Sequence, residues 1–100
     1  MSVKKVNDVL KQEGYGSSDE FLKDSALLIS LARRDQYQAE YDFFAKKYRM
    51  EVEEFERLLH QKRGKEDFKK EKDLEDWQFA EAALQWWEEK IKGLKSAKTS

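Results

Sequence analysis

The sequence predicts an all-α protein, a compact three- to four-helix bundle built around one long central helix. Residues 17–48 contain neither glycine nor proline, so their composition contains no strong helix breaker. Apolar residues recur along the chain at spacings of three and four, the period of a helix face, and no stretch alternates as a strand does. A chain of 100 residues is expected to form one helical domain over residues 1–100.

The central helix is expected over residues 18–48. Ser17 and Glu20 have the spacing of a capping box, in which each side chain accepts a hydrogen bond from the other residue's amide. About 30 helical residues make a rod of about 45 Å, along which shorter helices must pack. This helix has two apolar sides, one made of Phe21, Ser25, Leu28, Ala32, Ala39 and Phe43, and the other of Tyr37, Tyr41, Phe44 and Tyr48. It therefore needs more than one packing partner.

One short helix is expected before the central helix and another after it. Residues 3–12 carry an apolar stripe of Val3, Val6, Val9 and Leu10. A helix this short must dock on the core to be stable. Gly14 and Gly16 predict a left-handed turn after it, with Tyr15 covering the joint. Residues 51–62 form the next helix, with an acidic first turn and a buried stripe of Val52, Phe55, Leu58 and Leu59.

The last helix is expected over residues 74–94, with Asp73 as its N-cap. Its apolar residues step by three and four along a seam of Trp77, Ala80, Leu84, Trp87, Ile91 and Leu94. Because this seam keeps one face of the helix apolar, it is predicted to belong to the core. Residues 60–72 are expected to form a charged loop, with a loose turn of helix as the alternative, and residues 96–100 a frayed tail.

The composition excludes several kinds of site. The chain has no cysteine, which rules out a disulfide framework, a thiolate zinc site and a cysteine nucleophile. His60 is the only histidine in the sequence, and no Glu-x-x-His motif accompanies it, so neither a metal nor a cofactor is expected. The paired carboxylates lie in densely charged stretches, which are typical of a solvated helix surface rather than a dry catalytic cleft. We therefore expect no enzyme activity.

The charge balance gives little attraction to nucleic acid or to an anionic membrane, since 20 basic residues face 21 acidic ones. Residues 37–48 and 51–62 have the outline of a helix–turn–helix. The second of these helices begins with Glu51, Glu53 and Glu54, however, which would repel phosphates and disfavours nucleic-acid binding. No apolar signal segment or run of 18 apolar residues occurs, so we expect a cytoplasmic location and no membrane contact.

Aromatic residues provide the best candidates for partner binding. Phe68 stands alone in the predicted charged loop, and Trp86 lies about half a turn from the centre of the seam. Tryptophan, tyrosine and phenylalanine concentrate at the centres of protein interfaces. The alternative is that Trp86 forms a second core face and Phe68 a satellite contact. The expected partner-binding residues are Phe68, Phe79, Trp86, Tyr37 and Tyr41.

Two segments resemble the pattern of a known family. Residues 37–56, YQAEYDFFAKKYRMEVEEFE, resemble an aromatic helix followed by a Lys-Tyr-Gly-Met-Ser turn and Glu-Glu-Phe. Residues 73–80, DLEDWQFA, resemble an acidic helix start that continues Asp-Trp-Glu-Phe-Ala. The pattern is that of small helical prokaryotic proteins encoded beside a ribonuclease-type toxin. Here Arg49 replaces the glycine, Glu51 the hydroxyl cap and Gln78 an acid.

The resemblance implies an antitoxin whose partner is a toxin encoded by an adjacent gene. The expected function is therefore non-catalytic protein binding, in which the chain neutralises a small toxin by masking its surface. The alternative is a self-associating structural protein, a homodimer formed through the seam of residues 77–94. Co-purification with the product of the adjacent gene would favour the first.

Overall fold

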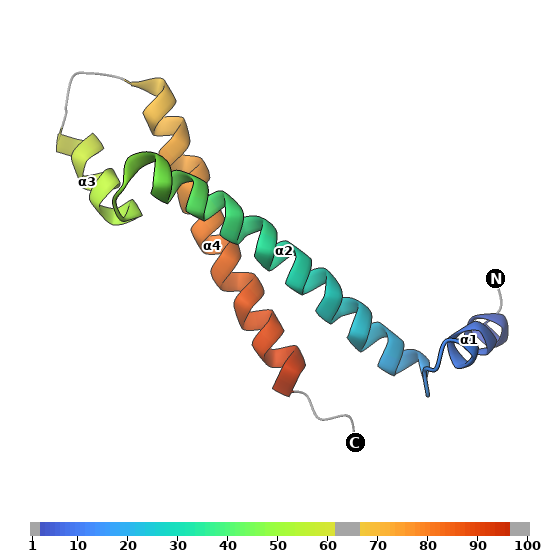
Figure 1. The fold of residues 1–100 in the computed structure, drawn as a ribbon. Coiled ribbons are helices and arrows are strands. Elements are labelled where there is room, and N and C mark those ends of the chain that lie inside the picture. Colours follow the sequence, from blue (N-terminus) through green and yellow to red (C-terminus); the bar gives the residue numbers. More distant parts are fainter. Residues whose placement is uncertain (1–2, 62–66, 97–100) are drawn as a thin grey trace.

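A computed structural model describes residues 3–61 and 67–96, and this part of the chain is helical apart from short connections (Figure 1). These residues form four helices in sequence: α1 (Val3–Gln12), α2 (Ser18–Tyr48), α3 (Val52–Gln61) and α4 (Phe68–Ser96). No strand occurs among the described residues. The all-α prediction is confirmed, and the long helix α2 has the predicted bounds.

The two long helices, α2 and α4, run antiparallel and form a two-helix layer (Figure 1). Trp77 of α4 is fully buried at the centre of the core. Three rings of α2 surround it at centroid distances of 5.9, 6.1 and 6.0 Å, those of Tyr41, Phe44 and Tyr48. The tyrosine-rich side of α2 is therefore the side that packs on α4.

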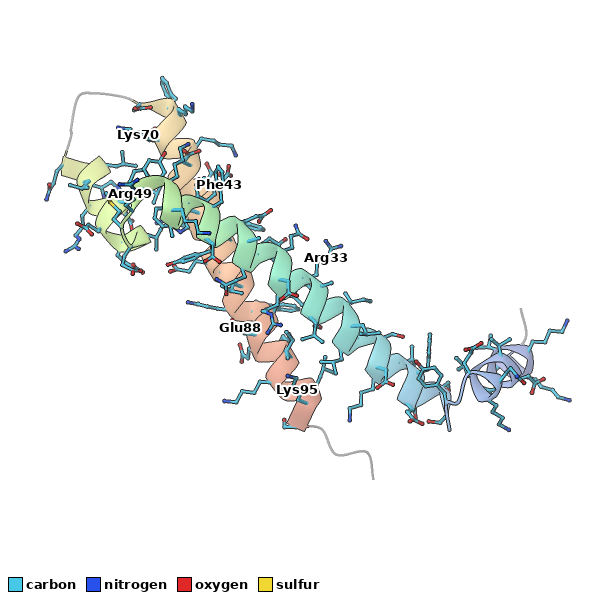
Figure 2. The ribbon with its side chains drawn as sticks, in the orientation of Figure 1. Arg33, Phe43, Arg49, Lys70, Glu88 and Lys95 are labelled. Atoms are coloured by element: carbon cyan, nitrogen blue, oxygen red, sulfur yellow. The ribbon has the colours of Figure 1, made fainter. Side chains whose placement is uncertain are left out.

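The short helix α3 covers the core at one end of this layer. Its Val52 and Phe55 are buried, and the Phe55 ring stacks on Tyr48 at 4.0 Å and lies 5.7 Å from Trp77. The chain turns into α3 through Arg49, whose φ of 54° lies in the left-handed region (Figure 2). Its N–H donates to the carbonyl of Ala45 at 2.8 Å. A side chain in this conformation costs about 1–2 kcal/mol, which the packing of α3 on Trp77 must offset.

Helix α4 begins at Phe68 rather than at residue 74, so the predicted loop over 60–72 is wrong for residues 60, 61 and 68–72, while Asp67 lies outside the helices. Residues 60 and 61 belong to α3, and 62–66 lie outside the described residues. Asp67 provides the N-cap, since its Oδ1 accepts from the Lys70 amide at 3.1 Å. The lysines and glutamates that follow Asp67 are good helix formers, so this charged stretch forms a solvent-exposed turn of helix rather than a loop.

Asp73 is not the N-cap of α4 but lies inside the helix. Its Oδ2 accepts hydrogen bonds from Lys47 Nζ at 2.6 Å and from Tyr48 Oη at 2.5 Å. The prediction of a cap is wrong because Asp67 already supplies one. Asp73 instead fastens the end of α2 to the second turn of α4.

The predicted capping box of α2 is confirmed in one of its two hydrogen bonds. Ser17 Oγ accepts from the Glu20 amide at 3.1 Å. The Glu20 carboxylate accepts from the Gly16 amide at 2.9 Å, one residue before the amide that was expected. The helix nevertheless begins where the capping box predicts.

Helix α1 docks only at its last turn. Gly14 has a φ of +92° and ends the helix, as predicted, and the Tyr15 ring meets Phe21 edge-on at 5.2 Å. Leu10 is buried at this joint. The expectation that the whole stripe docks on the core is wrong, because the other three members are exposed, namely Val3, Val6 and Val9.

The molecule is extended, and the prediction of a compact bundle is wrong. Its radius of gyration is 20.4 Å and its principal extents are 64 × 28 × 18 Å. A compact domain of about 100 residues would have a radius of gyration of about 13 Å. The physical reason is that α4 alone packs along α2, while α1 projects from the far end of α2 (Figure 1).

Candidate functional site

Three large aromatic side chains are exposed along one face of α4, and we call them the aromatic face: Phe68, Phe79 and Trp86. Their side chains are 71%, 63% and 50% exposed, respectively. Phe79 and Trp86 follow Phe68 by 11 and 18 residues, about three and five helical turns, which places all three on one side of the helix. They span about 27 Å along α4. All three were expected to bind a partner.

A groove of about 510 Å³ lies between α2 and α4 beside Phe79. The Tyr37 ring lies edge-on to Phe79, with a centroid distance of 5.9 Å, and Phe43 lines the groove from α2 (Figure 2). Glu40 and Asp76 place carboxylates at the groove. The structure therefore brings together two of the expected partner-binding residues, Tyr37 and Phe79, at an apolar groove with an acidic border.

Trp86 lies further along α4 and makes two contacts with its own helix. Its ring meets Trp87 edge-on at 4.7 Å, and Lys90 Nζ lies 4.9 Å above the ring centroid. Trp87 is half-buried, so it turns toward α2 while Trp86 faces outward. The indole of Trp86 is thus held in place from one side and open on the other.

Tyr41, the last of the expected partner-binding residues, also lies apart from the groove and is half-buried against Trp77. Its pKa is raised by burial and by the negative charges of nearby glutamates, chiefly Glu51 and Glu81. Burial also raises the pKa of Glu81, as do the charges of Glu53 and Glu51. Tyr41 therefore lies between the core and a group of carboxylates at α3 and α4, those of Glu51, Glu53 and Glu81.

The predicted seam of α4 is filled by α2 of the same chain. Trp77, Ala80 and Ile91 are buried, which confirms them as core, whereas Leu84 and Trp87 are half-buried. A homodimer through residues 77–94 would have to displace α2 from this seam.

The expectation that both apolar sides of α2 are covered is wrong. Phe43 and Leu28 are exposed, and so are Leu22 and Ile29 on the neighbouring stripe. Sequence reasoning did not identify this surface, although its signal was present. Helix α2 has two apolar sides, and only one later segment is long enough to pack along either of them.

In residues 3–61 and 67–96, no group of three or more histidine, aspartate or glutamate side chains is arranged to hold a metal ion. No helix in that part of the chain is long and apolar enough to cross a membrane. Comparisons with family models, curated proteins and solved structures find no match to the chain. The fold therefore defines it as an extended all-α protein with exposed aromatic residues along α4.

Proposed function

We propose that this protein is a non-catalytic protein-binding module that acts in the cytoplasm, with the aromatic face of α4 and the adjoining groove as its contact surface. The observation that carries the proposal is the exposure of Phe68, Phe79 and Trp86 on one side of one helix. Exposed aromatic side chains gathered on one surface mark interaction sites, and Trp and Tyr are frequent hot spots.

The partner we propose is a small ribonuclease-type toxin, whose surface the chain masks. This part of the proposal rests on the resemblance of residues 37–56 and 73–80 to antitoxin-like proteins. The two segments lie side by side, since Tyr48 bonds to Asp73 and Phe55 packs on Trp77. The resemblance therefore extends over one packed unit of the fold.

An extended shape suits inhibition by masking. The aromatic face spans about 27 Å, so a rod-like chain can cover a long strip of a partner surface with few residues. Glu40 and Asp76 border the groove beside Phe79, and they would favour a partner with basic side chains at that point. A nuclease that binds RNA phosphates has such side chains.

The test is co-expression of the chain with the product of the adjacent gene, followed by purification through a tag on the chain. We expect the two proteins to co-purify and the RNA cleavage of the toxin to be suppressed. Replacing Phe79 or Trp86 by alanine should weaken binding about 30-fold each, the equivalent of about 2 kcal/mol at a hot spot.

The matched control is Leu58→Ala, which removes a partly exposed apolar side chain from α3, a helix that does not carry the aromatic face. It should leave binding unchanged. Absence of co-purification would refute the toxin as partner. Co-purification that survives loss of Phe68, Phe79 and Trp86 together would place the contact surface elsewhere.

A further inference from the structure

A second apolar surface runs along α2, with the heptad spacing of a coiled-coil seam. Seven positions, which we call the α2 seam, alternate by three and four residues: Leu22, Ser25, Ile29, Ala32, Gln36, Ala39 and Phe43. None of the seven is charged, although 41% of the chain is charged. The absence of charge from this stripe is typical of a helix face that packs against another helix.

The α2 seam is uncovered within the described part of the chain. Its three large members are 61%, 57% and 60% exposed, namely Leu22, Ile29 and Phe43. Helix α4 packs on another side of α2, where Tyr41 and Tyr48 meet Trp77 and where Ser30 is buried. A second helix can therefore lie on the seam without displacing α4.

Side-chain size alternates along the seam in a way that selects the occupant. The first position of each heptad is large, as at Leu22, Ile29 and Phe43, and the fourth is small, as at Ala32 and Ala39. In an antiparallel pair of helices, first positions lie opposite fourth positions of the partner. A second copy of α2 in antiparallel orientation would therefore place a large side chain over a small one in each layer.

One register also pairs the polar members of the seam. When Ile29 lies opposite Ala32 of a second copy, Leu22 lies opposite Ala39, and Gln36 lies opposite Ser25. The Gln36 amide and the Ser25 hydroxyl can then hydrogen-bond across the interface, and a single polar layer of this kind fixes register in coiled coils. A parallel pair would instead place alanine over alanine and leave voids.

We propose that the α2 seam binds the same seam of a second copy, in antiparallel orientation, and forms a symmetric dimer. Both copies use the same patch, so the contact closes on itself and does not propagate into fibres. The strip from Leu22 to Phe43 is about 32 Å long and one helix wide, so the contact lies at the low end of specific interfaces. We expect dissociation in the micromolar range.

The same register places Asp19 of one copy near Glu40 of the other at each end of the seam. These like charges oppose association, and salt screens charges that are exposed to solvent. The dimer should therefore tighten as the salt concentration rises. The seam shares Gln36, Ala39 and Phe43 with the groove beside Phe79. Phe68 and Trp86 lie outside the seam, so replacing these two residues affects partner binding but should leave the dimer intact.

The first experiment measures mass by light scattering at protein concentrations from about 1 µM to 1 mM, a range that brackets the expected affinity. The wild-type chain should approach twice the monomer mass, and Ile29→Glu should remain monomeric. Leu58→Glu is the matched control, a charge placed on α3, and should still dimerise. A wild-type chain that stays monomeric throughout, or an Ile29→Glu variant that dimerises normally, would overturn the proposal.

Disulfide cross-linking tests the orientation of the two copies. Because the natural chain has no cysteine, each introduced cysteine is the only thiol in its chain. A mixture of Leu22→Cys and Ala39→Cys chains should form the mixed disulfide, whereas Leu22→Cys alone should form little. Asp24→Cys, an exposed position off the seam, should not cross-link to Ala39→Cys. Efficient cross-linking of Leu22→Cys to itself would show a parallel pair and overturn the antiparallel seam. Circular dichroism of each variant checks that the helices persist.

Discussion

The Tyr48 hydroxyl, at the last residue of α2, donates a 2.5 Å hydrogen bond to the carboxylate of Asp73 in α4. Lys47 donates to the same oxygen, so two consecutive residues of α2 hold one side chain of α4. Burial alone would raise the pKa of Asp73, but the hydrogen bonds from Lys47 and Tyr48 outweigh it and hold the pKa below its ordinary value. This contact fastens the antiparallel layer at the end where α3 joins it.

Removing the hydroxyl by Tyr48→Phe should lower the free energy of unfolding by about 1.5–3 kcal/mol, the value of a hydrogen bond to a charged group. Urea melts provide the measurement. Tyr37→Phe is the control, since it removes a hydroxyl from α2 at the groove, and it should cost less. In an Asp73→Asn background, the further change Tyr48→Phe should lower the free energy of unfolding only slightly, because the hydrogen bond is already weakened. If the losses of the two single variants simply add in the double variant, the two side chains do not interact.

Acid should weaken the protein partly through Asp73. Because its pKa is lower in the folded state, the folded chain holds the ionised form more readily than the unfolded chain does. This stabilisation is fully present above the unfolded pKa, near pH 4, and is lost as the pH falls through the folded pKa. Unfolding free energies measured from pH 6 to pH 2 should fall more steeply for the wild type than for Asp73→Asn. Parallel slopes would contradict the assignment.

Replacing Arg49 by glycine should stabilise the protein by about 1 kcal/mol. The residue has a φ of 54°, a region that glycine enters without the clash of a Cβ atom. Arg49→Ala is the matched control, because it removes the charged side chain but keeps the Cβ, and it should give no gain. Thermal and urea melts compare the three chains. Equal gains for alanine and glycine would mean that the guanidinium, rather than the backbone, carries the penalty.

The start of α4 should depend on Asp67. Asp67→Ala removes the side-chain acceptor for the Lys70 amide and should cost about 0.5–2 kcal/mol. Asp67→Asn keeps a capping oxygen and should cost much less. Backbone NMR shifts of residues 68–72 would report whether the first turn frays in the alanine variant. Unchanged helical shifts together with unchanged stability would show that this cap is dispensable.

Two tryptophans of α4 allow a direct comparison of buried and exposed rings. Trp77 is fully buried against α2 and α3, whereas Trp86 is half exposed. Trp77→Ala should cost about 3–5 kcal/mol, or prevent folding, because it opens a large cavity. Trp86→Ala should cost far less in the same melts. A large loss for Trp86→Ala would reassign that residue to the core and remove it from the aromatic face.

The sequence by itself determined the local structure. The cap at Ser17, the left-handed turn at Gly14 and the apolar seam that includes Trp77 and Ile91 each depend on residues within a few turns of one another. Such signals lie within one helix or at its ends, so no distant part of the chain is needed to read them. The start of α4 was misplaced because Asp67 and Asp73 offer the same local cap.

The tertiary structure decided which apolar stripes are covered. Along α2, one side packs on α4, whereas Leu22, Ile29 and Phe43 of the α2 seam stay exposed, although both sides are apolar in sequence. The same holds along α4, where Trp77 is core and Phe79 is exposed, two residues apart. Burial depends on how many helices reach a given face, which is a long-range property of the chain. Helical periodicity sets the direction in which each side chain points, but only tertiary packing decides whether solvent or another helix covers it.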